Sequence, residues 1–221
     1  MSGTFVVLEG LDGVGKSTQV ALLAAWLDGA GVRHLVVREP GGTPLGEAIR
    51  EVVLSRDLDV GAESELLLML AARAALVRSV IRPALADGKL VIADRFALST
   101  LAYQGYGRGL DPDRVRPVLD IATGGLRPDL YVVLDLPLQD SAERRSGNAA
   151  RPDRIEREGE SFRHKVREAY LALAEIEPGV AVLDARGTPE DVHGRVREIL
   201  TTRLPALAHS GPRMPRGQEE E

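Results

Sequence analysis

The chain has 221 residues, with 28 Lys and Arg against 33 Asp and Glu, a net charge of -5 and no cysteine. This length suits one α/β domain with a sizeable core and is short for two independent domains. The negative charge argues against a nucleic-acid-binding surface, because phosphate contacts need clustered Lys and Arg. The lack of cysteine excludes disulfides, thiolate metal sites and a cysteine nucleophile.

Neither membrane insertion nor export is expected. The longest aliphatic stretches, such as residues 66–72, stop well short of the roughly 20 apolar residues that a membrane-spanning helix needs. The N-terminus has no basic region followed by an apolar one and a small-residue cleavage site, so nothing marks it for export. We therefore expect a cytoplasmic protein that does not associate with membranes.

Five short apolar runs rich in Val alternate with segments of helical spacing. The runs are residues 5–8, 35–37, 90–93, 131–134 and 180–183, and the clearest helical segments are residues 19–27, 63–85 and 162–176. Such runs are typical of strands buried on both faces of a parallel sheet. Their alternation with helices predicts an α/β fold, a five-stranded parallel sheet flanked by helices.

An acidic residue follows each run closely: Glu9, Glu39, Asp94, Asp135 and Asp184. In open parallel sheets, ligands bind beyond the carboxyl ends of the strands. We interpret Asp184 as a cap of the following turn, whereas the neighbours of Glu9, Glu39 and Asp94 indicate a binding site.

Residues 10–17 read GLDGVGKS and fit the pattern G-x-x-x-x-G-K-[ST], directly between the first strand and a helix. The glycines let backbone N–H groups approach phosphate oxygens, and the helix N-terminus adds its dipole. We therefore expect a P-loop NTPase that binds a nucleoside triphosphate and Mg²⁺, with Lys16 on the β- and γ-phosphates and Ser17 on the metal. The expected nucleotide-binding residues are Gly10, Leu11, Asp12, Gly13, Val14, Gly15, Lys16, Ser17 and Thr18.

Other P-loop classes fit poorly. A switch GTPase needs an N-K-x-D base-reading motif, yet the only Asn is Asn148, which Ala149 follows. Residues 184–187 read DARG and resemble the D-x-x-G switch, but they follow the last strand, too late to sense a γ-phosphate. Large motor or transporter ATPases need a longer chain. A compact phosphotransferase with a second, acceptor pocket remains.

Three features support an acceptor pocket. Arg73 has apolar neighbours one helical turn away on both sides, which is costly unless its guanidinium meets a partner. The alternative is an Arg whose stem covers the core while its head stays in water. Asp94 and Arg95 directly follow the third strand, which predicts a Mg²⁺-water acceptor beside a phosphate clamp. Residues 143–157 carry five arginines and are either a solvated basic loop or a lid that closes on the phosphates.

These features predict one kinase domain over residues 1–204. The acceptor-binding region covers about residues 39–87 and the lid about residues 143–157. The tail, residues 205–221, has no periodicity, and we expect it to be disordered.

The sequence resembles a thymidylate kinase of the bacterial type over residues 5–204. Its most specific segment is IADRFALSTLAYQ at residues 92–104. Further matching segments are REPGGT at 38–43, GEAIR at 46–50, AAR at 71–73 and DRIE at 153–156. The resemblance implies transfer of a phosphoryl group from ATP to dTMP, which gives ADP and dTDP for dTTP synthesis, by a homodimer.

The resemblance also implies roles at the sugar and phosphate of the acceptor. Asp12 would hold the sugar 3′-hydroxyl and help to place Mg²⁺, and Asp94 would join Ser17 at the metal. Arg50 and Arg95 would grip the acceptor phosphate, a task that suits a planar, bidentate guanidinium.

At the base, the resemblance implies that Arg73 hydrogen-bonds the thymine carbonyl and that Thr100 and Gln104 face the base edge. Glu39 and Pro40 would line the pocket. Tyr103 would crowd the 2′ position of the sugar and so favour deoxyribose.

Two positions distinguish this chain within the family. Met69 stands where members usually carry a Phe that stacks on thymine, which predicts weaker or looser pyrimidine binding, although a thioether also packs on an aromatic face. Gly13 stands where eukaryotic-type members carry Arg, so the catalytic cation must come from the lid. Arg151 is the first candidate and Arg145 the second, acting with Lys16, Arg95 and Asp12 in catalysis.

Two other functions stay open on the sequence alone. A kinase for another nucleotide or nucleoside would keep the P-loop and lid but change the residues at the base edge. The second is a non-catalytic nucleotide-binding module, and the intact set of Lys16, Ser17, Asp94, Arg95 and the lid arginines weighs against it. Their presence favours an enzyme.

Overall fold

The computed structural model describes residues 3–146 and 153–208. Within these ranges, five parallel strands form one sheet in the order β2-β3-β1-β4-β5. The strands are β1 (Thr4–Glu9), β2 (His34–Arg38), β3 (Leu90–Asp94), β4 (Leu130–Asp135) and β5 (Val180–Asp184). Each strand contains one predicted run, so the predicted parallel sheet is confirmed.

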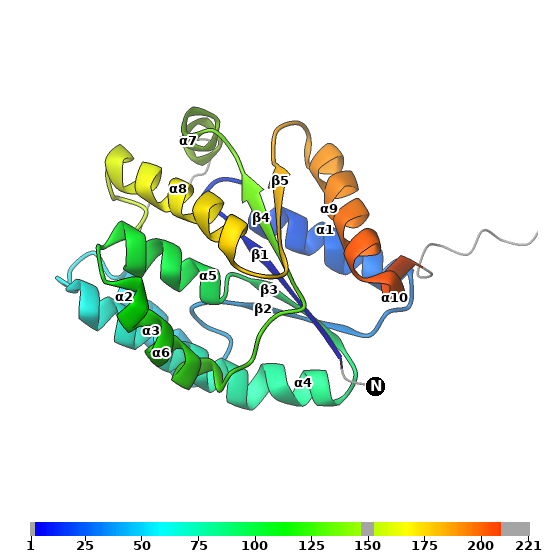
Figure 1. Cartoon of the computed structure of the whole chain (residues 1–221), viewed down its shortest axis with the longest axis horizontal. Helices are drawn as coiled ribbons and strands as arrows, with labels where there is room; N and C mark the ends of the chain where they lie inside the picture. The colour runs from blue at the N-terminus through cyan, green and yellow to red at the C-terminus, as the bar shows by residue number, and fades with distance from the viewer. Residues whose placement is uncertain (1–2, 147–152, 209–221) are drawn as a thin grey trace, which may run out of the picture.

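Helices cover both faces of the sheet (Figure 1). On one face, α1 (Lys16–Gly29) packs against α9 (Pro189–Arg203). The other helices in the described ranges are α2 (Pro44–Leu54), α3 (Ala62–Leu76), η1 (Val77–Ile81), α4 (Arg82–Ala86), α5 (Ala97–Thr100), η2 (Leu101–Gly107), α6 (Pro112–Thr123), α7 (Leu138–Ser146), α8 (Glu160–Ile176) and α10 (Pro205–Ala208), where η marks a π-helical segment. Across the described ranges, no helix combines the length and the apolar character needed to cross a bilayer.

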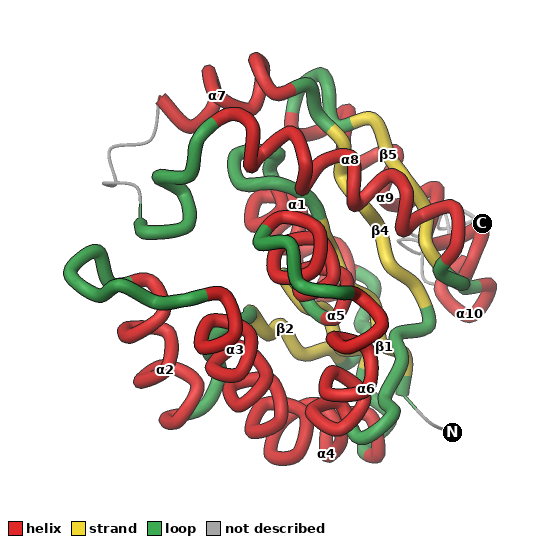
Figure 2. The backbone as a smooth tube through the Cα atoms, turned by 60° about the vertical axis from the view of Figure 1, so that its left-hand side comes forward, coloured by secondary structure: helices red, strands yellow, loops and turns green. Residues whose placement is uncertain are grey.

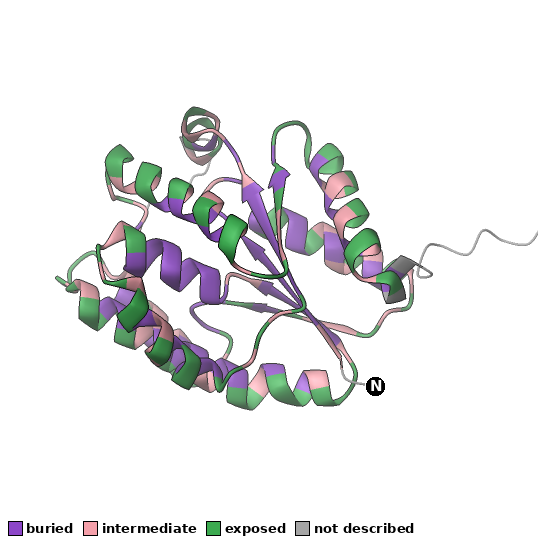
Figure 3. Cartoon of the chain, viewed as in Figure 1, coloured by how far each residue is buried: buried purple, intermediate pink, exposed green. Residues whose placement is uncertain are grey.

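The layers place two groups of helices around the carboxyl end of the sheet. The paired helices α2 and α3 lie on one side of this end and α7 lies on the other (Figure 2). The helix formed by α5 and η2 runs beneath them and is buried on nearly all sides (Figure 3). Side chains from these three groups therefore converge above β1, β2 and β3.

Burial on both faces is limited to the inner strands β1, β3 and β4. In β1, the side chains of Phe5 to Leu8 are at most 1% exposed. Val36 in β2 and Val182 in β5 are instead 41% and 45% exposed. The prediction of full burial is wrong for these two edge strands, because the covering helices lie over the middle of the sheet (Figure 3).

The predicted helix over residues 63–85 forms, but it is not α-helical throughout. Pro83 has no N–H, and its ring crowds the carbonyl four residues earlier. The backbone widens in front of it into η1, where the N–H of Arg82 donates to the carbonyl of Val77, five residues back. The helix thus continues past its proline.

The packed part of the chain extends beyond residue 204. Helix α10 follows α9 after Leu204, and its Leu207 is buried in the core. The predicted disordered tail therefore begins too early, because Leu207, the third residue of that tail, packs against the core. Residues 209–221 lie outside the described residues.

Candidate active site

A cavity of about 700 Å³ opens at the carboxyl end of the sheet. It brings together the predicted site residues Asp12, Gly13, Val14, Gly15, Lys16, Ser17, Thr18, Glu39, Pro40, Arg50, Met69, Arg73, Asp94, Arg95, Thr100, Tyr103, Gln104 and Arg145. Gly10 and Leu11 do not line it, but their carbonyls hold Lys16. Arg151 lies outside the described residues.

The P-loop joins β1 to α1. Lys16 is the first residue of α1, and its buried Nζ donates to the carbonyls of Leu11 (2.8 Å) and Gly10 (3.2 Å). Burial and the nearby Arg95 guanidinium lower the pKa of Lys16 to about 8, although Asp12 and Asp94 act in the opposite direction. The lysine thus lies on the loop as a poorly solvated cation, within reach of an anion placed there.

Gly13 marks a close approach between the P-loop and α7. Its φ is 86°, a left-handed conformation that suits glycine. A Cβ atom there would lie 2.6 Å from the carbonyl oxygen of Ser141 and 2.7 Å from Cγ of Arg145. The glycine therefore admits the backbone of α7 and lays the stem of Arg145 against the loop.

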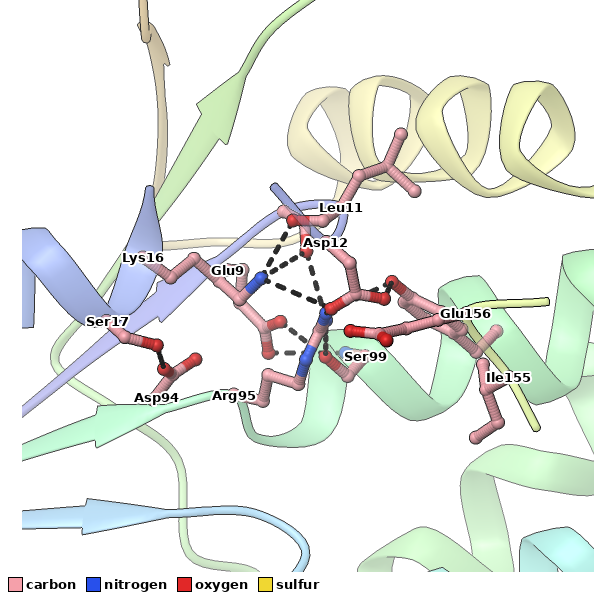
Figure 4. A network of polar contacts seen from close by, with 12 residues as sticks. Glu9, Leu11, Asp12, Lys16, Ser17, Asp94, Arg95, Ser99, Ile155 and Glu156 are labelled. Carbon is pink, nitrogen blue, oxygen red and sulfur yellow. Dashed lines mark hydrogen bonds and ion pairs between the residues drawn. The ribbon is translucent and has the colours of Figure 1, made fainter. Parts of the chain in front are cut away.

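Ser17 and Asp94 bring two oxygen-bearing side chains together at the cavity wall. The Ser17 hydroxyl donates to Oδ2 of Asp94 at 2.8 Å, although the residues come from different elements (Figure 4). A hydroxyl and one carboxylate are hard donors of the kind that Mg²⁺ takes together with substrate phosphates and water. The donor set therefore fits the predicted metal.

Arg95 is the centre of a charged cluster that faces the cavity. Its φ of 75° is uncommon for a residue with a side chain, and such outliers concentrate at functional sites. Nη2 donates to Oδ1 of Asp12 at 2.6 Å (Figure 4). It also donates to the hydroxyl of Tyr103 at 3.1 Å. Burial alone would raise the pKa of Asp12, but Arg95 and Lys16 outweigh burial and lower that pKa to about 2. Asp12 is therefore an anion at neutral pH.

The buried carboxylate of Glu9, below the cavity, is linked to Nη1 of Arg95 through two hydroxyl groups. Oε2 of Glu9 accepts from the hydroxyls of Ser99 (2.6 Å) and Tyr170 (2.9 Å). Both hydroxyls in turn accept from Nη1 of Arg95, at 3.1 and 3.2 Å. Burial raises the pKa of Glu9, and Arg95 and the hydrogen bonds offset only part of that rise. The position of Glu9 at a strand end was recognised in the sequence, but its partners Ser99 and Tyr170 were not.

Arg73 is buried, with 3% of its surface exposed, so the alternative of a solvated head is wrong. Its Nε and Nη2 donate to Oε2 of Glu39 at 2.8 and 2.5 Å. Nη1 donates to the hydroxyl of Thr100 at 2.7 Å, and Nη2 also donates to the carbonyl of Phe96 at 2.9 Å. Of its five N–H groups, one on Nη1 has no partner among the described residues. Arg73 lines the cavity, and it carries this free N–H donor.

Pro40, Arg50 and Met69 complete this end of the cavity. The Glu39–Pro40 peptide bond is cis, and the Pro40 carbonyl accepts from Nη1 of Arg50 at 3.0 Å. Oε1 of Glu39 is buried and has no hydrogen-bond partner among the described residues. Burial raises the pKa of Glu39, an effect that Arg73 offsets only in part.

The predicted lid contains two differently placed groups of arginines. Arg144 and Arg145, in α7, line the cavity beside the P-loop. Arg154, beyond residues 147–152, instead donates to Glu65 at 2.5 Å and to the carbonyl of Val53 at 2.9 Å. Arg154 therefore anchors its segment to α2 and α3, whereas the α7 arginines face the P-loop. Among the described residues, Arg145 is the best candidate for the catalytic cation of the lid.

The far end of the cavity was not recognised in the sequence. It is lined by Gln19, Arg144, Gly187, Pro189 and Val192. Gln19 donates to the Pro189 carbonyl at 2.9 Å, and Nη2 of Arg144 donates to the carbonyls that flank Arg186. The available signal was position, because the turn after β5 ends at the same edge of the sheet as the P-loop.

Comparisons with known proteins agree with this geometry. A family model described as thymidylate kinase matches residues 8–196. The chain belongs to the thymidylate kinase family. The thymidylate kinase of Fervidobacterium nodosum is 46% identical over 200 residues, covering 90% of this chain and all of that protein. The thymidylate kinase of Desulforudis audaxviator is 48% identical over 210 residues, covering 92% and 94% of the two chains.

The fold agrees as well. The crystal structure of thymidylate kinase from Ehrlichia chaffeensis matches with a TM-score of 0.74 and 32% identity, over 90% of this chain and all of that one. The family consists of nucleoside monophosphate kinases that transfer a phosphoryl group from ATP to dTMP, giving dTDP for dTTP synthesis. The predicted P-loop fold and thymidylate kinase activity are therefore confirmed at the level of the family.

Proposed function

We propose that the protein phosphorylates dTMP in this cavity and that the residues predicted from the sequence carry out the reaction. The observation that carries the proposal is that one cavity joins the P-loop to the pocket around Arg73 and Gln104. A direct phosphoryl transfer requires donor and acceptor to lie in one space with the reacting atoms in contact. A purely nucleotide-binding module has no need of the second pocket.

At the donor end, the triphosphate of ATP lies on the P-loop, with Lys16 turned from its two carbonyls toward the β- and γ-phosphates. Ser17 and Asp94 would hold Mg²⁺, which when bound would neutralise negative charge on the phosphates of ATP. The nucleoside of ATP extends toward Arg144, Gly187 and Pro189.

At the acceptor end, the base of dTMP lies against Met69, with the free N–H of Arg73 toward a thymine carbonyl and Gln104 at the base edge. Thr100 holds Arg73 in place, and Glu39 and Pro40 form the pocket wall. The proposed contacts to the sugar are made by Asp12 and Tyr103. Those to the acceptor phosphate are made by Arg50 and Arg95.

The reaction is an in-line transfer. An oxygen of the dTMP phosphate forms a bond to the γ-phosphorus, the bond to the oxygen between the β- and γ-phosphorus atoms breaks, and ADP leaves with that electron pair. The attacking oxygen is already anionic near neutral pH, so no general base is required. Catalysis is then positioning and charge neutralisation by Lys16, Arg95 and the lid arginines Arg145 and Arg151.

ADP release with Mg²⁺-ATP tests the proposal against a panel of acceptors: dTMP, dUMP, dCMP, AMP, GMP, thymidine and none. The expected result is strong turnover with dTMP and lower turnover with the other acceptors. Preference for another acceptor would show a kinase with the same fold and phosphate chemistry but a different substrate. ATP binding without turnover on any acceptor would identify a binding module.

We also propose that the enzyme works as a homodimer. The outer faces of α2, α3 and α6 carry exposed large apolar side chains. These are Leu45, Val52, Leu67 and Ile121, of which Ile121 is 80% exposed. A second copy of the chain would remove them from water.

A further inference from the structure

The orientation of one side-chain amide decides what the acceptor pocket shows to a base. Gln104 lies in η2, is 2% exposed and lines the cavity. Its amide has a carbonyl oxygen that accepts hydrogen bonds on one side and an NH₂ group that donates them on the other. The two orientations have nearly the same shape, so a neighbour must select between them.

That neighbour is Glu65 of α3, which is fully buried. Its Oε1 accepts from Nε2 of Gln104 at 2.8 Å. Its two oxygens also accept from Arg108, at 3.2 and 3.0 Å, and Oε2 accepts from Arg154 at 2.5 Å. Every one of these contacts brings a donor to the carboxyl group.

Glu65 is therefore ionised. Burial alone would raise its pKa, but hydrogen bonds from Arg108, Gln104 and Arg154 together lower it. An ionised carboxylate only accepts hydrogen bonds. Gln104 must give it the NH₂ group, which leaves the carbonyl oxygen of Gln104 for the cavity.

We propose that Glu65 is a specificity-determining positioning residue that makes the pocket select pyrimidines with an N3–H group. The proposal rests on the proposed function, in which the base lies between Arg73 and Gln104. Thymine offers an acceptor at O4 and a donor at N3, which match the free N–H of Arg73 and the oxygen of Gln104. Cytosine offers a donor at N4 and an acceptor at N3, so both contacts are reversed.

The size of the effect follows from the hydrogen bonds involved. A buried polar group that faces a like partner costs more than the bond that it replaces, so a wrong base is rejected more strongly than one bond suggests. A fixed carbonyl oxygen at Gln104 therefore favours dTMP and dUMP alike over dCMP. It does not distinguish thymine from uracil, since both carry N3–H.

The test is Glu65→Gln, assayed as kcat/KM for dTMP, dUMP and dCMP. A neutral amide at position 65 both donates and accepts, so it allows Gln104 to turn its NH₂ group to the base. The ratio of dTMP to dCMP activity is expected to fall by about tenfold or more, while the ratio of dTMP to dUMP stays unchanged. An equal loss on all three acceptors would show a merely structural role and overturn the proposal.

Two further variants separate specificity from stability. Arg108→Lys removes the paired contact to Glu65 but keeps a positive charge and the bond between Glu65 and Gln104. It should lower the thermal unfolding temperature and leave the dTMP to dCMP ratio unchanged; a fallen ratio would contradict the proposal. If Glu65→Gln is too unstable to assay, Glu65→Asp keeps the charge and withdraws the carboxylate from Gln104, and the same fall in the ratio is expected.

A double variant tests whether the effect passes through Gln104. In a Gln104→Leu background, Glu65→Gln should change the ratio no further, because the amide that it orients is gone. A further fall of similar size would overturn the assignment. Failure of the wild-type enzyme to prefer dTMP would instead contradict the proposed function, whereas an intact dTMP preference in Glu65→Gln would contradict this inference alone.

Discussion

At the scale of single residues, the site is built from charged side chains whose partners decide what each of them offers to a ligand. Glu39, Thr100 and the Phe96 carbonyl take four of the five N–H donors of Arg73 and leave one, which we propose for the base. Asp12 stays anionic because Arg95 and Lys16 face it. In each case the residue type permits several roles, and the hydrogen-bond partners select one.

Lys16 predicts a pH dependence of nucleotide binding. Its pKa of about 8 in the free enzyme means that it loses its proton as the pH rises through that value, and bound phosphates raise the pKa again. The dissociation constant of Mg²⁺-ADP should therefore rise by about tenfold from pH 7 to pH 9, as measured by titration calorimetry. Lys16→Arg keeps its charge over this range, so its profile should be flat; a flat wild-type profile would contradict the assignment.

Replacing Met69 with an aromatic residue is predicted to raise the affinity for dTMP. It lines the acceptor end of the cavity, where a Phe would stack on the base. A thioether against an aromatic face contributes about 0.3–1.5 kcal/mol, and an aromatic pair contributes a comparable amount with more buried area. Met69→Phe should tighten dTMP binding by about three- to tenfold. An unchanged dissociation constant would show that Met69 already packs as well as Phe.

At the scale of elements, α7 and the P-loop act as one unit because Gly13 lets them touch. The end of β1 fixes the position of the P-loop, which leads directly into α1. The close contact of Gly13 with Ser141 fixes the position of α7 and of its arginines. The segment after residue 152 is held separately. Asp153 caps it by accepting from the N–H groups of Ile155 and Glu156, and Glu156 returns a bond to the Asp153 N–H.

The lid arginines are therefore expected to differ in their effects. Arg151→Ala should lower kcat by about 10³-fold with a modest change in KM, because a lid cation stabilises the charge of the transferring group. Arg144→Ala, at the far end of the cavity, should mainly raise KM for ATP. Steady-state kinetics of these variants and of Arg145→Ala decide the assignment: unchanged kcat in Arg151→Ala with a large fall in Arg145→Ala would pass the role to Arg145.

At the scale of the whole molecule, the parallel sheet collects the site. Glu9, Asp94 and Glu39 come from segments far apart in the chain, yet β1, β3 and β2 are neighbours that end at one edge. Helices α3 and η2 then bring Arg73 and Gln104 to the same edge. The outer faces of α2, α3 and α6 remain as apolar surface.

The proposed dimer predicts that a charge on this surface separates the subunits. Leu67 is 61% exposed on α3, so Leu67→Asp costs little in the isolated fold but places a carboxylate in the proposed interface. Sedimentation velocity should show a dimer for the wild type and a monomer, or at least a tenfold weaker dimer, for the variant. Glu63→Gln, on the exposed part of the same helix, serves as the control. A monomeric wild type would contradict the proposed homodimer.

Much of the fold could be predicted because its signals are local. The five strands, the P-loop and the order of elements follow from short apolar runs, glycines at fixed spacing and strand-helix alternation. The errors occurred where distant parts of the chain decide the outcome. Exposure of Val36 and Val182, the π-helical turn before Pro83 and the packing of Leu207 all depend on neighbours that sequence spacing does not specify.

The sequence by itself determined the chemistry of the protein. Glycine spacing around Lys16, the pair Asp94 and Arg95, and the family segments identify a P-loop kinase, because these residue types must occur close together in the chain. Only the tertiary structure decided which partner each side chain meets. Arg154 joins Glu65 rather than the P-loop, and Glu65 turns the amide of Gln104, because hydrogen bonds depend on distances of a few ångströms between elements that are remote in sequence.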